Sequence, residues 1–336
     1  MLDKRLQFFI LVFAALLFLA APVRAESRTM ALVGKHTVRD CAGRQIRAEK
    51  PFSRIISLYG AHTENLFALG LDKEIIGVGR HPDYPEKARK KPGFSPQDGP
   101  EKFLAARPDL VLVRPMLDRG YEPLMNQLEK FDIRVVSLQP GDIEEMKTYW
   151  RILGRLTGRE DAAEEMIADF DQGVKQARLL AGQIPEKKRV YFEAIHDRFK
   201  TFTPDSMPVF ALECAGGINA ADDVSQVRNT NIAEFGRERI MARGGQIDVY
   251  LAQNGPMNSV DVKDIENEPG YNVIKAVQQG EIYIVDEQIV ARPTLRLLKG
   301  IWTIGEILYP DVYTKETVGE ILGAEVRRQR SVDSGQ

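Results

Sequence analysis

The sequence predicts an α/β fold of two lobes, each built on a parallel sheet, with one long helix between them. Three observations lead to this prediction: short apolar runs that each precede a polar or glycine-rich loop, a weak internal repeat, and a helical pattern between the two halves. The chain of 336 residues is long enough for two separate cores.

Short apolar runs mark the strands of the first half. Ile55–Leu58, Ile75–Val78 and Leu110–Val113 are too short for helices and are bounded by turn residues. Strands that are buried on both faces of a parallel sheet have this pattern. The loops after them are expected at the carboxyl edge of the sheet, where open α/β sheets bind their ligands.

A helix–strand unit occurs twice. Glu101–Pro115 and Glu238–Pro256 each begin with an acid and a base, run through a short apolar helix, turn, and end in an apolar strand and a loop with proline. Chance similarity between ordinary helix–strand units is the alternative. The repeat favours two similar, Rossmann-like lobes.

The segment between the halves is helical by its apolar spacing. The pattern runs from Met146 to Leu156, stops at Gly158 and resumes from Glu160 to Leu180. The second part has about 22 residues, so one continuous helix would span about 33 Å and form a stiff link. The predicted divisions are a signal peptide (1–25), an N-terminal extension or hairpin (26–52), an N-terminal lobe (53–158), a connecting helix (159–183), a C-terminal lobe (184–310), and a C-terminal helix and tail (311–336) with the helix over Lys315–Arg328.

The first 25 residues predict export. Two basic residues precede an apolar block from Phe8 to Ala21, and Val-Arg-Ala at 23–25 fits cleavage after Ala25. The block of about 14 residues is short for a membrane span, which needs about 20. A retained membrane anchor is the alternative.

Composition and motifs exclude several functions. A formal net charge of −2 gives no general affinity for nucleic acid or anionic lipid. The sequence has no G-x-S-x-G elbow, P-loop or G-x-G-x-x-G fingerprint, so we expect neither an enzyme nor a cofactor. Cys41 and Cys214 either form a disulfide between the lobes or are two ordinary buried cysteines.

The order of these elements resembles the periplasmic substrate-binding proteins of ABC importers for iron–siderophore complexes, haem and cobalamin. These are the class III periplasmic binding proteins, with a single helical backbone between lobes. The matching stretches are RIISLYGAHTENLFALG (54–70), IIGVGRHPDYPEKA (75–88), FLAARPDLVLV (103–113), LEKFDIRVVSL (128–138), LECAGGINA (212–220) and GEIYIVDEQIVARPTLRLLKGI (280–301).

The resemblance implies a ligand cleft between the lobes, small closure, a location in the periplasm, and delivery to an inner-membrane permease with its ATPase. We expect a monomer. The resemblance also implies that Glu101 and Glu238, at matching places in the repeat, pair with arginines of the permease. Simple complementation of the helix dipole is the alternative role for these carboxylates.

Loops at the predicted carboxyl edges supply the candidate ligand contacts. They are Tyr59, His62, Arg80, His81, Arg114, His196, Arg198, Arg228, Gln253 and Arg292, with Met116 in the same set of loops. Arginines that converge from both lobes suit an anionic ligand, because guanidinium groups bind carboxylate and catecholate oxygens in bidentate fashion. We therefore predict an iron complex, a ferric siderophore-like chelate, as the ligand.

Three alternatives stay open. The first is cobalamin, another corrinoid or haem, although His81 stands where such proteins often have tyrosine and no tryptophan lies near Phe94–Gln97. The second is a bare zinc or manganese ion bound by His62, His81 and His196, of which His81 and His196 are the main metal candidates. The third is an exported enzyme or sensor subunit on the same fold.

Overall fold

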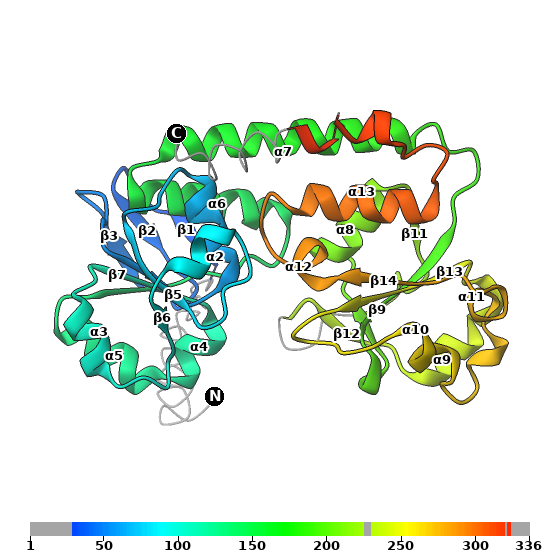
Figure 1. Cartoon of the computed structure of the whole chain (residues 1–336), viewed down its shortest axis with the longest axis horizontal. Coiled ribbons are helices and arrows are strands. Elements are labelled where there is room, and N and C mark those ends of the chain that lie inside the picture. The colour runs from blue at the N-terminus through cyan, green and yellow to red at the C-terminus, as the bar shows by residue number, and fades with distance from the viewer. Residues whose placement is uncertain (1–28, 225–229, 320, 324–336) are drawn as a thin grey trace, which may run out of the picture.

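Two lobes stand side by side in the computed structural model, which describes residues 29–224, 230–319 and 321–323. Figure 1 shows helix α7 (Glu160–Ala181) running along one side of both lobes. The predicted α/β fold with a single connecting helix is confirmed.

The first lobe is built on a parallel sheet in the order β6-β5-β4-β7-β8. Its strands are β4 (Ile55–Ser57), β5 (Ile75–Gly79), β6 (Gly93–Phe94), β7 (Leu110–Val113) and β8 (Arg134–Ser137). Its helices are α2 (Gly60–Ala68), the 3-10 helix η1 (Glu86–Lys90), α3 (Pro100–Ala106), α4 (Pro115–Gly120) and α5 (Glu122–Lys130). Every residue of β4 and β7 is buried, as apolar runs in the middle of a parallel sheet should be.

The second lobe has a mixed sheet, which corrects the prediction of a wholly parallel one. Its order is β12-β10-β9-β13-β14, with β11 also paired to β9. Strands β10 and β12 are antiparallel to their neighbours, whereas β9, β11, β13 and β14 pair in parallel. The reason is the short turn over residues 196–199, because a parallel connection needs a crossover of a dozen or more residues.

The elements of the second lobe have the following bounds. The strands are β9 (Arg189–Ile195), β10 (Lys200–Phe202), β11 (Ile218–Asn219), β12 (Ile232–Glu234), β13 (Val249–Asn254) and β14 (Ile282–Asp286). The helices are η2 (His196–Arg198), α8 (Met207–Cys214), α9 (Arg237–Ala242), η3 (Gly244–Gln246), α10 (Val262–Glu266), η4 (Tyr271–Val273), α11 (Lys275–Gln279), α12 (Glu287–Val290) and α13 (Leu297–Leu308).

The residues before β4 form a small antiparallel sheet of β1 (Ala31–Leu32), β2 (Thr37–Arg39) and β3 (Gln45–Arg47). Asp40 ties it to the first lobe: its side chain is fully buried and accepts a hydrogen bond of 3.0 Å from the Ser137 backbone N–H. Cys41 and Cys214 are both unpaired in the structure.

Helices α6 (Ile143–Thr157) and α7 pack together as a hairpin. The Asp142 side chain caps the start of α6. Gly158 ends α6 in the left-handed conformation (φ 65°), which favours glycine. The chain then enters α7, which is continuous for 22 residues.

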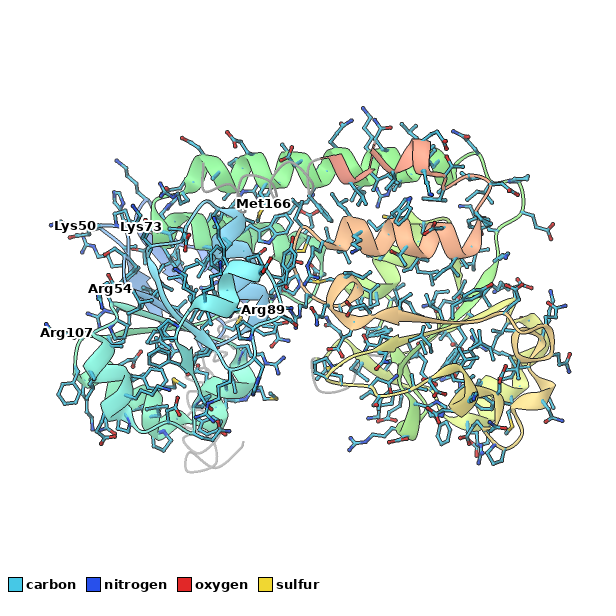
Figure 2. The ribbon with its side chains drawn as sticks, in the orientation of Figure 1. Lys50, Arg54, Lys73, Arg89, Arg107 and Met166 are labelled. Carbon is cyan, nitrogen blue, oxygen red and sulfur yellow. The ribbon has the colours of Figure 1, made fainter. Side chains whose placement is uncertain are left out.

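A row of aromatic rings carries the core from one lobe to the other. Trp150 of α6 packs edge-on against Phe170 of α7, with ring centroids 5.6 Å apart, and Phe170 stacks on Phe210 of α8 at 6.2 Å. Met166, also fully buried, lies on the face of α7 that is turned towards the lobes (Figure 2). The two lobes therefore share one core along this helix.

The ends of the chain are only partly described. Residues 315–319 and 321–323 are helical, within the predicted helix Lys315–Arg328. The remainder of that helix, the tail and the predicted signal peptide lie outside the described residues. Within the described ranges, no helix is long and apolar enough to cross a membrane.

We predict that the lobes close by only a few degrees when ligand binds, because α7 is continuous and the core runs through it. Small-angle scattering should give nearly the same radius of gyration with and without ligand. Gln172→Pro, at an exposed position of α7, should broaden the distribution of lobe separations, since proline in a helix interior costs about 3 kcal/mol. Gln172→Ala is the control. A large ligand-induced compaction of the wild-type protein would contradict the rigid link.

Candidate ligand-binding site

In each lobe, one central strand is paired on both sides, and the chain passes first to one side of it and later to the other. In the first lobe β4 lies between β5 and β7, and in the second β9 lies between β10 and β13. Open α/β sheets bind ligands at such a point, outside the carboxyl ends of the strands. The loops after β4, β7, β9 and β13 are therefore the walls of the candidate site.

Tyr59 and Arg114 form the wall of the first lobe. Tyr59 follows β4 and Arg114 follows β7, and the guanidinium carbon lies 5.0 Å from the centre of the tyrosine ring. Burial raises the pKa of Tyr59 despite the lowering effect of Arg114, so its hydroxyl stays protonated at neutral pH. Among the described residues, Arg114 has no ion-pair partner. This wall is aromatic and cationic, and ligand contact by both residues stays a prediction.

His62 lies behind this wall and has no nitrogen left for a ligand. Its Nδ1 is 2.6 Å from the hydroxyl of Tyr149 and its Nε2 is 3.0 Å from the carbonyl of Val113. Complete burial lowers the pKa of His62 to about 4, so the ring is neutral. The prediction that His62 contacts ligand or metal is wrong. Its hydrogen bond instead fixes the end of β7, next to Arg114.

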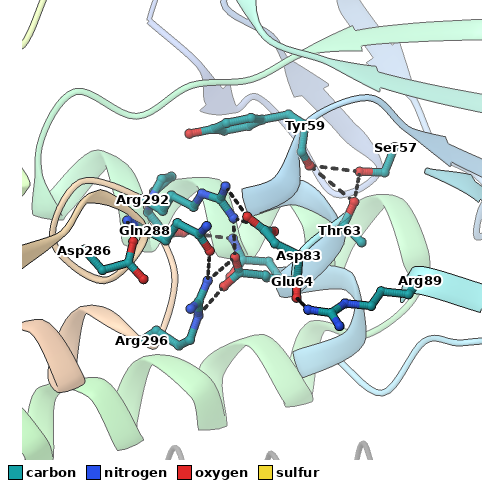
Figure 3. Close-up of polar contacts among 12 residues, drawn as sticks. Ser57, Tyr59, Thr63, Glu64, Asp83, Arg89, Asp286, Gln288, Arg292 and Arg296 are labelled. Atoms are coloured by element: carbon teal, nitrogen blue, oxygen red, sulfur yellow. Dashed lines mark hydrogen bonds and ion pairs between the residues drawn. The ribbon is translucent and has the colours of Figure 1, made fainter. Parts of the chain in front are cut away.

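Four charged residues join the lobes at the base of the cleft (Figure 3). Glu64 of α2 accepts hydrogen bonds from Arg292 at 2.9 Å and from Arg296 at 2.6 and 2.9 Å. Asp83, in the loop after β5, accepts two from Arg292 at 2.9 and 3.0 Å. We call Glu64, Asp83, Arg292 and Arg296 the interlobe cluster. Its two negative and two positive charges balance each other.

The charged groups of the interlobe cluster lie close together. Glu64 is only 4% exposed, so its charge depends on the two arginines. Burial acts to raise the pKa of Asp83, but the hydrogen bonds and charge of Arg292 outweigh it and the pKa is lowered. A Cβ on Gly60 would lie 2.9 Å from Nη1 of Arg292, so a larger residue at the start of α2 would require the guanidinium group to shift.

A second contact between the lobes lies beside the cluster. The carbonyl of Pro293 accepts hydrogen bonds from the Asn65 amide at 2.9 Å and from the Trp150 indole at 3.3 Å. Both donors belong to the first lobe, on α2 and α6. The loop between α12 and α13 is therefore fixed to the first lobe by neutral as well as charged groups.

Glu287 forms part of the facing wall in the second lobe. It begins α12, and its Oε2 accepts a hydrogen bond of 2.8 Å from the backbone N–H of Met257, in the loop after β13. Burial raises the pKa of Glu287, although Arg292 and Arg114 act to lower it. Arg114 of the first lobe is thus among the charges that act on Glu287 of the second lobe.

His196 follows β9 and lies between two carboxylates. Its Nδ1 is 2.9 Å from Glu193 and its Nε2 is 3.8 Å from Glu268. The hydrogen bond to Glu193 raises the pKa of His196 against the opposing effect of burial. Glu193 is fully buried and also accepts a 2.5 Å hydrogen bond from the hydroxyl of Tyr250. A polar cavity of about 380 Å³ opens between His196 and α10.

The other predicted contacts in the first lobe lie on the surface. Arg80 is exposed and forms an ion pair with Asp98. His81 is exposed on the loop that carries Asp83, with a left-handed backbone (φ 56°). Arg80 is therefore engaged within its own lobe instead of being free for an anion.

The predicted contacts in the second lobe differ in accessibility. Arg198 is exposed at the end of η2. Gln253 is fully buried and donates a 3.1 Å hydrogen bond to the carbonyl of Ala194, so it holds β13 to β9 and does not face the cleft as predicted. Arg292 belongs to the interlobe cluster, and Arg228 lies outside the described residues.

The predicted three-histidine metal site is not formed. His62 is buried in the first lobe, His81 is exposed on a loop, and His196 is bonded to glutamates in the second lobe. Throughout the described part of the chain, no three His, Cys, Asp or Glu side chains are placed to hold a metal ion. The bare-metal alternative therefore has no site here.

Glu64, Asp83, Glu287 and Met257 are site residues that the sequence did not reveal. The burial of Glu64 among Ala61–Phe67 of α2, which calls for a cationic partner, becomes visible only in the structure. Asp83, Glu287 and Met257 carried no sequence signal either. Their partners lie in distant segments, as with Asp83 and Arg292, which are 209 positions apart.

We predict that Glu64→Gln lowers the free energy of unfolding by about 3–5 kcal/mol, because it leaves two buried arginines short of a partner. The control is Glu164→Gln, which removes a carboxylate with a similar two-bond contact to Arg151 but on the surface. That change should cost under about 1 kcal/mol. Urea unfolding measures both, and equal small losses would show that the cluster does not stabilise the lobes.

Comparison with known proteins agrees with this architecture. Residues 55–289 match the family model described as periplasmic binding protein. The ABC transporter substrate-binding lipoprotein YvrC of Bacillus subtilis (strain 168) is 25% identical over 285 residues, covering 82% of this chain and 86% of the relative. The vitamin B12-binding protein of Vibrio vulnificus (strain CMCP6) is 23% identical over 261 residues, covering 76% and 90%.

A solved structure gives the same result. A protein of Staphylococcus epidermidis ATCC 12228, named as a possible iron-binding (periplasmic solute-binding) protein, superposes with a TM-score of 0.68 at 26% identity. The superposition covers 77% of this chain and 100% of that one. The family model spans more than half of the sequence, and the solved fold matches both lobes. The chain belongs to the periplasmic binding protein family.

Proposed function

We propose that this protein captures an anionic iron complex, a ferric siderophore-like chelate, between its two lobes and delivers it to the permease of an ABC importer. Its role is binding and delivery, as a monomer, without catalysis. Substrate-binding proteins of ABC transporters are among its relatives. The identity of the ligand is the part that this proposal adds.

Arg114 is the observation that carries the choice of ligand. It lies over Tyr59 at the carboxyl ends of the paired strands β4 and β7, and the described residues offer it no ion-pair partner. A guanidinium group placed in this way is available for carboxylate or catecholate oxygens. Burial raises the pKa of Glu287 in the second lobe, so this carboxylate would repel an anion less as the pH falls.

Other basic side chains do not supply this charge. Arg292 is neutralised within the interlobe cluster, and Arg80 by Asp98. Lys50, Arg54 and Arg107 lie at the outer side of the first lobe, away from the second lobe (Figure 2). In the described part of the second lobe, the loop after β9 contains one further exposed arginine, Arg198.

We predict that a ferric chelate with catecholate or carboxylate donors binds the purified protein, and that Arg114→Ala weakens binding about tenfold or more through loss of charge-assisted hydrogen bonds. Arg119→Ala, at an exposed position on the same helix, is the matched control and should change affinity less than about twofold. Calorimetric titration with siderophore chelates, haem, cobalamin and divalent metals measures these effects. Tight binding of cobalamin alone would overturn the choice of ligand.

Export fits this role. The predicted signal peptide and its cleavage after Ala25 lie outside the described residues, and a periplasmic location is part of the proposal. Mass spectrometry of the protein recovered from the periplasm should show a chain that begins at Glu26. A chain that keeps residues 1–25 would favour the membrane-anchored alternative.

Two exposed glutamates are candidates for docking on the permease. Glu101 and Glu238 each occupy the first turn of a helix, α3 or α9, directly after a Gly-X pair that starts it. Both are exposed, and neither forms an ion pair with the described part of the chain. Figure 1 places α3 and α9 in different lobes, both on the side of the molecule opposite α7. One carboxylate per lobe on a common face supports the docking role over mere helix capping.

We predict that the Glu101→Lys, Glu238→Lys protein keeps its ligand affinity within about twofold but loses stimulation of the importer's ATPase, because charges at the rim govern encounter and register. Alanine at both positions should have a smaller effect. Asp161→Lys is the control, because Asp161 is an exposed first-turn carboxylate on α7, on the opposite side. ATPase assays in reconstituted membranes measure the loss. Full ATPase stimulation by the charge-reversed protein would refute the docking role and leave helix capping as the role of both residues.

A further inference from the structure

Two exposed methionines occupy equivalent places in the two lobes. Met116 directly follows Pro115, after β7, and Met257 directly follows Pro256, after β13. Their exposed fractions are 56% and 44%, which puts them among the most exposed large apolar side chains described. The repeated helix–strand unit therefore ends in the same Pro-Met pair in each lobe.

Met116 lies on the wall of the first lobe. It is in the first turn of α4, two residues after Arg114, whose guanidinium covers the Tyr59 ring. Figure 1 shows α4 on the side of the first lobe that faces the second. Met116 therefore lies at the same strand end as the cationic group that we assign to the ligand.

Met257 lies on the opposite wall. At the end of β13, Asn254 pairs with Asp286 of β14, so the loop after β13 lies beside the start of α12. Figure 1 shows α12 at the end of the second lobe nearest the first. The backbone N–H of Met257 donates a 2.8 Å hydrogen bond to Glu287, the first residue of α12.

We propose that Met116 and Met257 contact the ligand from both sides, and that the ligand class is an anionic complex whose surface is aromatic or conjugated. This proposal rests on the proposed function and names its substrate class more closely. The thioether group is polarizable and makes favourable contacts with aromatic rings. A chelate with aliphatic donors would leave both side chains without such a partner.

The rigid link between the lobes gives a physical reason for methionine at these places. Because α7 and the interlobe cluster limit closure, the fit to the ligand must come from side chains at the cleft walls. Methionine is unbranched and adapts its shape to an irregular surface. Each thioether is exposed, while its backbone follows the end of a strand and a proline.

The test uses two trianionic probes, a hexadentate ferric tris-catecholate and ferric tris-oxalate, which differ in aromatic surface but not in charge. The wild-type protein should prefer the tris-catecholate. The Met116→Ala, Met257→Ala protein should bind the tris-catecholate about tenfold more weakly and the tris-oxalate within about twofold, so the preference collapses. Phe131→Ala is the control, because Phe131 is 59% exposed but lies before β8, at the amino edge of the sheet.

Arg114→Ala separates this proposal from the proposed function, since it should weaken both probes equally. If the wild-type protein binds both probes and loses both with Arg114→Ala, while the double methionine variant behaves as wild type, the methionine contacts are refuted and the proposed function stands. If the wild-type protein binds neither probe, the proposed function fails and the inference that rests on it fails too.

Oxidation gives a readout that does not depend on substitution. In the free protein, hydrogen peroxide should convert Met116 and Met257 to sulfoxides well before the buried Met146 and Met166. The redox-inactive gallium(III) tris-catecholate should slow oxidation of the two exposed methionines and leave the buried ones unchanged. Peptide mass spectrometry measures each site, and oxidation of Met116 and Met257 at unchanged rates in the complex would overturn the proposal.

Discussion

The buried contact between Glu64 and the two arginines Arg292 and Arg296 is the interaction on which the rest of the structure depends. It joins α2 of the first lobe to the loop before α13 of the second; Glu64 and Arg296 are buried, and Arg292 is partly buried. A charge in such a place is stable only while its partners stay in position. The cluster therefore fixes how far apart the lobes stand, and with them the walls of the cleft. Because Glu64 lies one turn after Tyr59, it also fixes the start of α2, from which Tyr59 meets Arg114.

The structure therefore combines a rigid frame with adaptable side chains. The row Trp150–Phe170–Phe210 and the continuous α7 hold the lobes along one side, and the interlobe cluster holds them at the base of the cleft. On the proposed function, ligand binding then needs little ordering of the chain, because these contacts already fix the two lobes relative to each other. Adjustment to a ligand is left to exposed side chains at the ends of the strands. In our proposal, Met116 and Met257 are such positions, because both are exposed at equivalent strand ends.

The local sequence pattern predicted most of the fold, because helices and strands are recognised from consecutive residues. The runs at Ile55–Leu58 and Leu110–Val113 became buried central strands, and the uninterrupted spacing after Glu160 became α7. The second sheet was mispredicted as wholly parallel, because the four-residue turn before β10 has no strong glycine or proline signal.

The site was predicted less well than the fold, for a physical reason. Tyr59 and Arg114 were predicted because they follow strands, and their contact with ligand stays a prediction. Arg292 was read as a ligand contact, yet its partner Glu64 is 228 positions away, and no local pattern reports such a pair. His62 failed in the same way, since its hydrogen bond to Tyr149 joins residues 87 positions apart. A polar residue after a strand marks the edge where ligands bind, but whether its side chain is free depends on tertiary contacts.

The two walls of the cleft differ in charge, and this difference bears on how a ligand would lie. The first lobe presents Arg114 over Tyr59, whereas the second presents Glu287 and, after β9, His196 between Glu193 and Glu268. An anionic complex is attracted to the first wall and meets carboxylates at the second, so it is oriented as well as bound. The raised pKa of Glu287 lessens that asymmetry as the pH falls, because the protonated carboxyl no longer repels an anion and can donate a hydrogen bond to it. The same frame would hold a neutral ring system without this orientation, which is why charge-matched probes separate the contribution of Arg114 from that of the methionines.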